Sequence, residues 1–163
     1  MELFPAVHSN LFFLAAKRKT AREKLEDAKG LPRIVDTPKG VMFIPKPLDV
    51  DALIKKVERG NLATADQIRN RLAMDAGAEY SCPLVTGIFL RIAAEAAEED
   101  ISEGKEPSPY WRIVKSDGSL NEKFPDGAKW QAARLMEEGH TIEQGKGKKP
   151  PKVKDFGKFI QEI

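Results

Sequence analysis

Cys82 is the residue of this chain with the most direct chemistry, because it carries the only thiol in 163 residues. It stands immediately before Pro83, at the predicted start of a helix. The positive end of a helix dipole can lower the pKa of a thiol and so favour the nucleophilic thiolate. Cys82 therefore has the position of a group acceptor, while the ordinary interpretation is a small packing residue ahead of an apolar helix.

A second candidate is the hexapeptide Pro109-Tyr110-Trp111-Arg112-Ile113-Val114, which sets two aromatic rings beside a guanidinium group. An exposed aromatic platform could stack a nucleic-acid base, at about 1–3 kcal/mol per base. The alternative is structural, with Tyr110 and Trp111 as alternate residues of a strand, one buried and one half exposed. Arg112 suits a buried ion pair with a helix-end carboxylate as well as a phosphate contact. A cleft at this place favours the platform, and a filled core favours the structural role.

Composition and charge limit the other kinds of site. A single cysteine allows neither an internal disulfide nor a cysteine metal cluster, and it favours a reducing, cytoplasmic setting. His8 and His140 lack a metal-ligand spacing, so we expect no metal and no cofactor. The apolar run at residues 11–16 is too short to span a membrane. The net charge of +2 and the pI near 8.6 fall short of a dedicated nucleic-acid domain, so the placement of charge matters more than its sum.

The elements before the middle of the chain follow from charge and proline content. Residues 16–29 predict a short basic helix, whose charged face is either a solvated surface or a phosphate-contacting arm. Residues 31–48 contain four prolines and predict an extended linker with one short strand at 41–44. We therefore divide the chain into a basic, proline-rich extension at 1–48, a central domain at 49–143 and a lysine-rich segment at 144–163.

Two helices are predicted at the start of the central domain. The first, at residues 49–59, begins with Asp49 as a cap and has one apolar face. That face consists of Val50, Leu53, Ile54 and Val57. Thr64 and Gln67 have the spacing of a capping box, which predicts a second helix at 65–76.

Proline fits the first turn of a helix, so Pro83 predicts the start of a third. Its expected core stripe consists of Leu84, Ile88, Phe89, Ile92 and Ala96. The acidic end of this helix, at residues 95–100, opposes the helix dipole and is expected to be well solvated.

The rest of the central domain predicts a strand at 110–115, a turn at Asp117-Gly118 and a last helix capped by Asp126. The expected core residues of that helix are Ala128, Ala132, Leu135 and Met136. Two short strands around Thr141 and Val153 would enclose a lysine-rich tip. Two helices joined by a turn and followed by a strand and turn have the order of a winged helix-turn-helix.

Residues 57–140 resemble the C-terminal DNA-binding domain of alkylguanine-DNA alkyltransferases, which repair DNA, and of alkyltransferase-like proteins. The matching segments are Arg59-Gly60-Asn61-Leu62-Ala63-Thr64, the hexapeptide at 109–114, Asp117-Gly118, Phe124-Pro125-Asp126-Gly127 and Leu135-Met136-Glu137-Glu138-Gly139-His140. About half of the chain is covered. The resemblance implies an α/β fold with a winged helix-turn-helix domain, an N-terminal extension and double-stranded DNA as a partner.

The departures from the family pattern concern its chemistry. The family cysteine that takes the alkyl group and the histidine that activates it correspond to Tyr110 and Trp111, and neither side chain can do that work. The family's base-rotating tyrosine corresponds to Ala65, and its arginine finger to Thr86 or Gly87. The resemblance therefore implies a protein that is not an enzyme, with Cys82 as the remaining candidate alkyl acceptor.

The resemblance also assigns the expected site residues. DNA-facing candidates on the two motif helices are Thr64, Arg69, Arg71, Thr86 and Arg91. The former active-site pocket would be lined by Tyr110, Trp111, Arg112, Phe124, Pro125 and Glu138. Glu138 matches the glutamate that supports the family's histidine, and without that partner it is a helix-end carboxylate.

The leading functional hypothesis is a non-catalytic DNA-binding protein, with the lysines of the C-terminal segment adding salt-sensitive affinity. Recognition of modified or distorted DNA is what the resemblance implies. The alternative is a protein-interaction module on a retained winged-helix scaffold, favoured by the acidic segment at 95–106 and the modest net charge.

Overall fold

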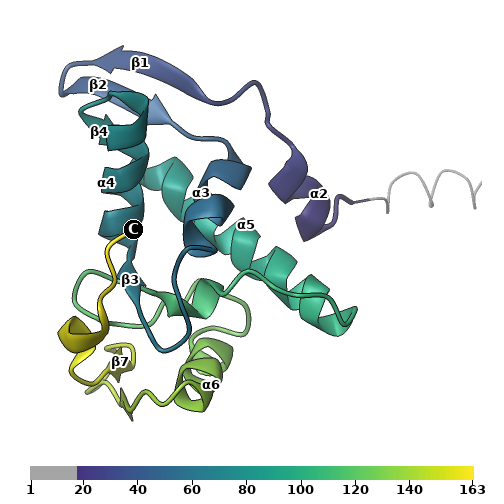
Figure 1. The fold of residues 1–163 in the computed structure, drawn as a ribbon, viewed down its shortest axis with the longest axis vertical. Coiled ribbons are helices and arrows are strands. Elements are labelled where there is room, and N and C mark those ends of the chain that lie inside the picture. Colours follow the sequence, from purple (N-terminus) through teal and green to yellow (C-terminus); the bar gives the residue numbers. More distant parts are fainter. Residues whose placement is uncertain (1–17) are drawn as a thin grey trace, which may run out of the picture.

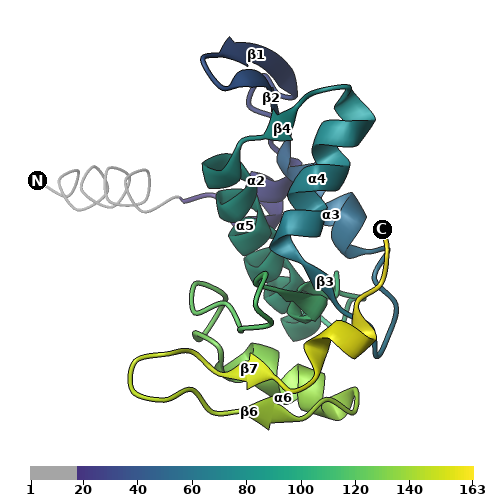
Figure 2. The same ribbon diagram turned by 90° about the vertical axis from the view of Figure 1, so that its left-hand side faces the viewer.

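The computed structural model describes residues 18–163, in which one long helix, α5 (Pro83–Ser102), runs through the centre (Figures 1 and 2). His8, the apolar run at 11–16 and the first two residues of the expected basic helix lie outside the described residues. The mixed α/β character expected from the sequence is confirmed, with helices α2 to α6 and three small sheets. None of the helices in the described part combines the length and the apolar character that a membrane crossing needs.

The segment before residue 48 is more regular than predicted. Helix α2 (Ala21–Glu26) is shorter than the predicted 16–29, and it begins at a capping box formed by Thr20 and Glu23. The predicted extended linker contains a hairpin instead, in which β1 (Arg33–Thr37) pairs antiparallel with β2 (Gly40–Ile44). The prolines did not prevent pairing because Pro32 precedes β1, Pro38 lies in the turn and Pro45 follows β2.

Helix α3 (Pro47–Ile54) begins two residues earlier than predicted. Pro47 occupies the first turn, and the Asp49 carboxylate accepts a hydrogen bond from the backbone of Lys46 at 3.0 Å. The helix also ends earlier, although Val57 beyond it is buried as expected. The predicted apolar face is confirmed, since Val50, Leu53, Ile54 and Val57 all belong to the main core.

The predicted capping box of the next helix is confirmed. The Thr64 hydroxyl accepts from the Gln67 amide at 3.1 Å, and the Gln67 side chain accepts from the Thr64 amide at 2.8 Å. Helix α4 (Ala65–Ala76) ends at Gly77, whose φ of +68° suits a residue without a side chain. Strand β4 (Tyr80–Ser81) then pairs in parallel with β2 and leads into α5.

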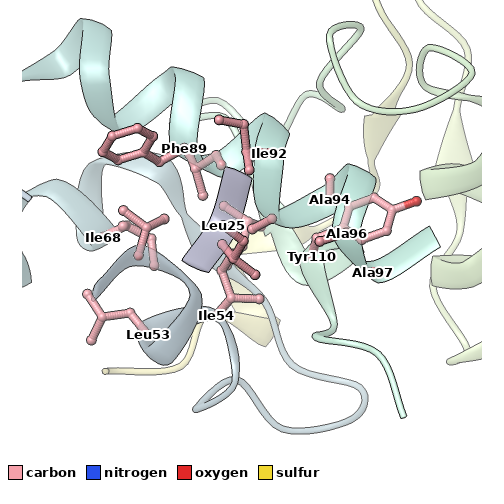
Figure 3. Close-up of a cluster of buried hydrophobic side chains, with 14 of the residues drawn as sticks. Leu25, Leu53, Ile54, Ile68, Phe89, Ile92, Ala94, Ala96, Ala97 and Tyr110 are labelled. Carbon is pink, nitrogen blue, oxygen red and sulfur yellow. The ribbon is translucent and has the colours of Figure 1, made fainter. Parts of the chain in front are cut away.

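The buried face of α5 differs from the prediction. Phe89, Ile92 and Ala96 are buried, but Leu84 is 73% exposed and Ile88 is 40% exposed. The buried positions of the first turns are instead Thr86, Phe89 and Leu90. The periodicity of α5 is compatible with two apolar faces and does not predict which one is buried. The face that carries the alanines is the buried one, because α2, α3 and Tyr110 pack against it (Figure 3).

The acidic end of α5 was expected to be well solvated, and that prediction is wrong. Glu99 accepts hydrogen bonds from the first amides of α2, at Ala21 (2.7 Å) and Arg22 (3.1 Å). Asp100 is paired with Arg22, and Glu98 forms a bidentate pair with Arg134. The carboxylates are therefore used to attach neighbouring helices, which relieves the unfavourable interaction with the dipole of α5.

The hexapeptide is not the predicted strand. Residues Tyr110–Arg112 form a 3-10 turn, η1, and only β5 (Ile113–Val114) is extended, pairing in parallel with β3 (Ala63–Thr64). The turn at Asp117-Gly118 is present, with the Gly118 amide donating to the Lys115 carbonyl at 2.9 Å.

The last helix, α6 (Lys129–Glu137), begins after Ala128 rather than at Asp126, whose φ of +57° places it in the preceding turn. Leu135 is buried as expected, whereas Met136 is exposed. The two predicted short strands are confirmed as β6 (Ile142–Glu143) and β7 (Lys152–Val153), followed by the 3-10 turn η2 (Phe156–Phe159). Residues of β7 and η2 pack with Leu62 and Leu120 in a second, smaller core.

Candidate nucleic-acid interface

A groove of about 350 Å³ lies between the first turns of α5, the start of α4 and the loop after β5. Its apolar part is formed by the exposed side chains of Leu84 and Ile88. The cationic side chains along it are Arg69, Arg91, Lys115 and Lys123. Glu122 is the acidic residue among those that line it.

The four cations differ in how far their charge is already compensated. Arg69 pairs with Asp66 on the same helix, and Arg91 lies 3.6 Å from Glu95. Within the described residues, neither Lys115 nor Lys123 lies within ion-pair distance of a carboxylate. The charges of these two lysines are therefore not compensated by an ion pair in the part of the chain that the structure describes.

The lysine-rich hairpin of β6 and β7 is bonded to the loop that lines one side of this groove. Backbone hydrogen bonds join Leu120 to Pro151 at 2.9 Å and Val153 to Gly118 at 3.0 Å, so the hairpin is attached to the loop that carries Lys123. Lys146, Lys148 and Lys149 in the connection between the strands are exposed. Figure 2 shows this connection extending outward from the part of the molecule that lies below α5.

The structure separates the five residues that were expected to face DNA. Arg69 and Arg91 line the groove. Arg71 lies away from it, paired with Asp75 at 2.8 Å in a depression that also contains the C-terminal Ile163. Thr64 is half-buried, and its side chain is used in the capping box of α4.

The expectation for Thr86 is wrong. Its side chain is completely buried, and its hydroxyl donates to the Cys82 carbonyl at 2.8 Å. Leu84 and Ile88 occupy the exposed positions beside it, and sequence reasoning had assigned them to the core. Cys82 precedes this turn and is half-buried, and it does not belong to the residues that line the groove.

The site that the sequence resemblance assigned to the family's reaction centre is filled. Tyr110 is fully buried and packs edge-to-face against Trp111 (centroids 5.5 Å apart) and Phe124 (5.2 Å). Its hydroxyl donates to the Glu98 carboxylate at 2.6 Å, and burial together with this carboxylate raises the pKa of Tyr110. Figure 3 shows Tyr110 among the alanines of α5, as part of the main core.

Glu138 is held by three neighbours rather than by a catalytic partner. Arg112 donates to it through Nε (3.0 Å) and Nη2 (2.7 Å), the Trp111 indole donates at 2.9 Å and the Gly60 amide at 3.1 Å. Arg112 also donates to the Val57 carbonyl at 2.6 Å. Burial alone would raise the pKa of Glu138, but the hydrogen bonds from Arg112 and Trp111 outweigh it and lower the pKa.

The six residues expected to line one pocket are therefore not brought together around a cavity. The side chains of Tyr110 and Phe124 are packed in the core, and that of Glu138 is hydrogen-bonded to Arg112. Pro125 lies half-buried in the turn before α6. Trp111 and Arg112 instead border an open hollow of about 440 Å³. Its other lining residues are Lys55, Glu106, Pro107 and Pro109. Among the described residues, no group of three histidine, cysteine, aspartate or glutamate side chains is arranged to hold a metal ion.

No protein-family model and no curated protein matches this chain. Two solved structures of S. pombe proteins are similar to it. One is ATL in complex with DNA, with a TM-score of 0.51 and 17% sequence identity over 72% of this chain and 94% of that one. The other is Atl1 in complex with damaged DNA containing O6-carboxymethylguanine, with a TM-score of 0.48 and the same identity and coverage. The chain therefore has the fold of an alkyltransferase-like protein, as its motifs predicted.

Proposed function

We propose that this protein binds double-stranded DNA without transferring an alkyl group. The observation that carries the proposal is the cationic groove of Arg69, Arg91, Lys115 and Lys123. The lysine hairpin is hydrogen-bonded to the loop that contributes Lys123 to this groove. The fold supports it, because the S. pombe ATL structure of the same fold is a complex with DNA.

The groove has the features that phosphate binding requires. The unpaired lysines can neutralise phosphates and release counterions, which is the main source of affinity in sequence-independent binding. The first turn of α5 adds the positive end of a helix dipole on the same side. In our proposal, the first turns of α5 enter a groove of the duplex and the β6–β7 hairpin serves as the wing, contacting the adjacent backbone.

The proposed absence of alkyl transfer is supported by the residues at the position that the resemblance assigns to the family's reaction centre. Tyr110 is buried and bonded to Glu98, and Trp111 donates to Glu138, so neither can act as nucleophile or base. We propose that modified or distorted DNA is bound and left unchanged.

The alternative of a protein-interaction module loses its main support. Three carboxylates in the middle of the acidic segment that favoured it already have partners within the protein. Glu98 pairs with Arg134, Glu99 accepts a hydrogen bond from the Ala21 amide, and Asp100 pairs with Arg22. An acidic surface free to attract a partner is therefore not present at those positions.

Replacing both Lys115 and Lys123 with alanine is expected to weaken binding to a duplex of any sequence. The slope of log affinity against log salt concentration should fall by roughly 1 for each lysine that contacts a phosphate. A titration of labelled duplex at several salt concentrations measures both quantities. The matched control is Lys24→Ala with Lys56→Ala, which removes the same charge from α2 and from the turn after α3. No binding by the wild-type protein at low salt would overturn the proposed function.

Cys82 is expected to stay unmodified by alkylated DNA. The protein would be incubated with a duplex containing O6-methylguanine and its intact mass measured. An unchanged mass is expected, because Cys82 lies outside the residues that line the cationic groove. A mass gain of one methyl group that disappears in Cys82→Ser would show that the protein is an alkyl acceptor after all.

A further inference from the structure

Leu84 and Ile88 form an apolar pair on the exposed side of α5. They are 73% and 40% exposed, and their i, i+4 spacing places them on the same side of the helix, one turn apart. Single exposed leucines are ordinary on protein surfaces. This pair is different because it lies within the groove that also contains the unpaired lysines.

The combination of an apolar strip with cationic neighbours matches one kind of ligand particularly well. A DNA duplex presents negative phosphates outside and an apolar stack of bases inside. Lys115 and Lys123 complement the phosphates, and Leu84 and Ile88 are the large apolar side chains that this groove exposes. Apolar side chains such as leucine and isoleucine insert between base pairs in several classes of DNA-binding proteins.

We propose that Leu84 is a wedge that inserts between base pairs of bound DNA, supported by Ile88. This inference rests on the proposed DNA-binding function and adds a reason for preferring distorted DNA. Opening a base step costs a few kcal/mol, and the cost is smaller where a mismatch or damaged base already weakens stacking. A protein that inserts Leu84 therefore binds such duplexes more tightly than intact ones.

The helix around Leu84 is held firmly enough to carry a wedge. Pro83 fixes the first turn, the Thr86 hydroxyl is bonded to the Cys82 carbonyl, and Phe89 anchors the opposite face in the core. Gly87 leaves open space beside the pair, since no atom lies within 4 Å of the place where a side chain would begin. The DNA backbone can therefore approach α5 closely at this point.

The test compares two duplexes of one sequence, one intact and one with a single mismatched pair beside a fluorescent 2-aminopurine. The wild-type protein should bind the mismatched duplex more tightly and raise the 2-aminopurine fluorescence as the base unstacks. Leu84→Ala should reduce affinity for the mismatched duplex by roughly tenfold, within the range of one stacking contact, and abolish the fluorescence change. The loss of affinity for the intact duplex should be smaller, because opening an intact base step offsets more of what insertion of Leu84 contributes. The salt dependence of binding should stay the same, because the lysines are unchanged.

The matched control is Met74→Ala, since Met74 is 71% exposed on α4 and borders a different depression. It should leave both affinities and the fluorescence change intact. Equal binding of both duplexes by the wild-type protein would overturn the wedge and leave DNA binding standing. The same would follow if Met74→Ala reproduced the effect of Leu84→Ala. A wild-type protein that binds neither duplex would instead overturn the proposed function itself.

Discussion

Replacing Glu138 with alanine is expected to lower the free energy of unfolding by about 3–5 kcal/mol, because it leaves a buried charge without its partner. The Glu138 side chain is 3% exposed and that of Arg112 is 13% exposed. In the variant, the Arg112 guanidinium would keep its hydrogen bond to the Val57 carbonyl but would face a cavity in place of the carboxylate. Chemical denaturation, followed by circular dichroism, measures the change.

The neighbouring glutamate provides the control. Glu137 is exposed, and its side chain makes no ion pair within the described residues. Glu137→Ala should therefore change stability by less than about 0.5 kcal/mol. Equal effects of the two substitutions would mean that the Arg112–Glu138 pair does not hold the last helix to the rest of the fold.

The contribution of Glu138 to the free energy of unfolding should also depend on pH, and it should decrease in acid. Its pKa is lowered from 4.5 in the folded protein, so the folded state favours the ionised form. The stabilisation is then fully present above about pH 4.5 and is lost as the pH falls through the lower, folded-state value. The difference in stability between the wild-type protein and Glu138→Gln should accordingly shrink in acid. It should stay constant above about pH 7, where buried His140, whose pKa is lowered by burial and raised by the Glu138 charge, is neutral in both proteins.

Local sequence signals were sufficient to predict a helix end where residues of the helix itself determine that end. The capping box of Thr64 and Gln67, the glycine at 77 and the proline at 83 each satisfy or remove backbone donors at a helix end, whatever the surroundings. The match of Glu138 to a family glutamate also identified a carboxylate that is bonded to the hexapeptide. Its structural role as the partner of Arg112 was one of the alternatives that the sequence left open.

Long-range packing decided the features that the sequence could not predict. Whether Leu84 or Thr86 faces the core depends on where α2, α3 and η1 pack against α5, and no periodicity within α5 contains that information. The solvation of Glu99 likewise depends on the amides of Ala21 and Arg22, which are far away in sequence. The candidate groove was therefore located only in part, through Arg69 and Arg91, while its lysines and apolar strip were missed.

Replacing Tyr110 with alanine is the second substitution with a large expected effect. The side chain is fully buried and packs against two aromatic rings, so its loss should destabilise the protein by about 3–5 kcal/mol. Tyr110→Phe keeps the packing and removes one hydrogen bond to a carboxylate, which corresponds to about 1.5–3 kcal/mol. Glu98 would keep its bidentate pair with Arg134, which places the phenylalanine variant at the lower end of that range. Chemical denaturation of both variants measures the two changes in the free energy of unfolding. The change in Tyr110→Phe reports the hydrogen bond, and the additional change in Tyr110→Ala reports the packing.

The same position tests whether the buried hexapeptide and the proposed DNA-binding groove are independent. Tyr110 lies in the core, whereas Lys115 and Leu84 line the groove, so Tyr110→Phe should leave DNA affinity within about twofold. Tyr110→Cys would place a thiol at the position that the resemblance assigns to the family's nucleophile, but that thiol would be enclosed by Phe124 and the alanines of α5. We expect no gain in mass when that variant meets alkylated DNA. Methyl uptake by Tyr110→Cys would contradict the filled core and show that a base still reaches this place.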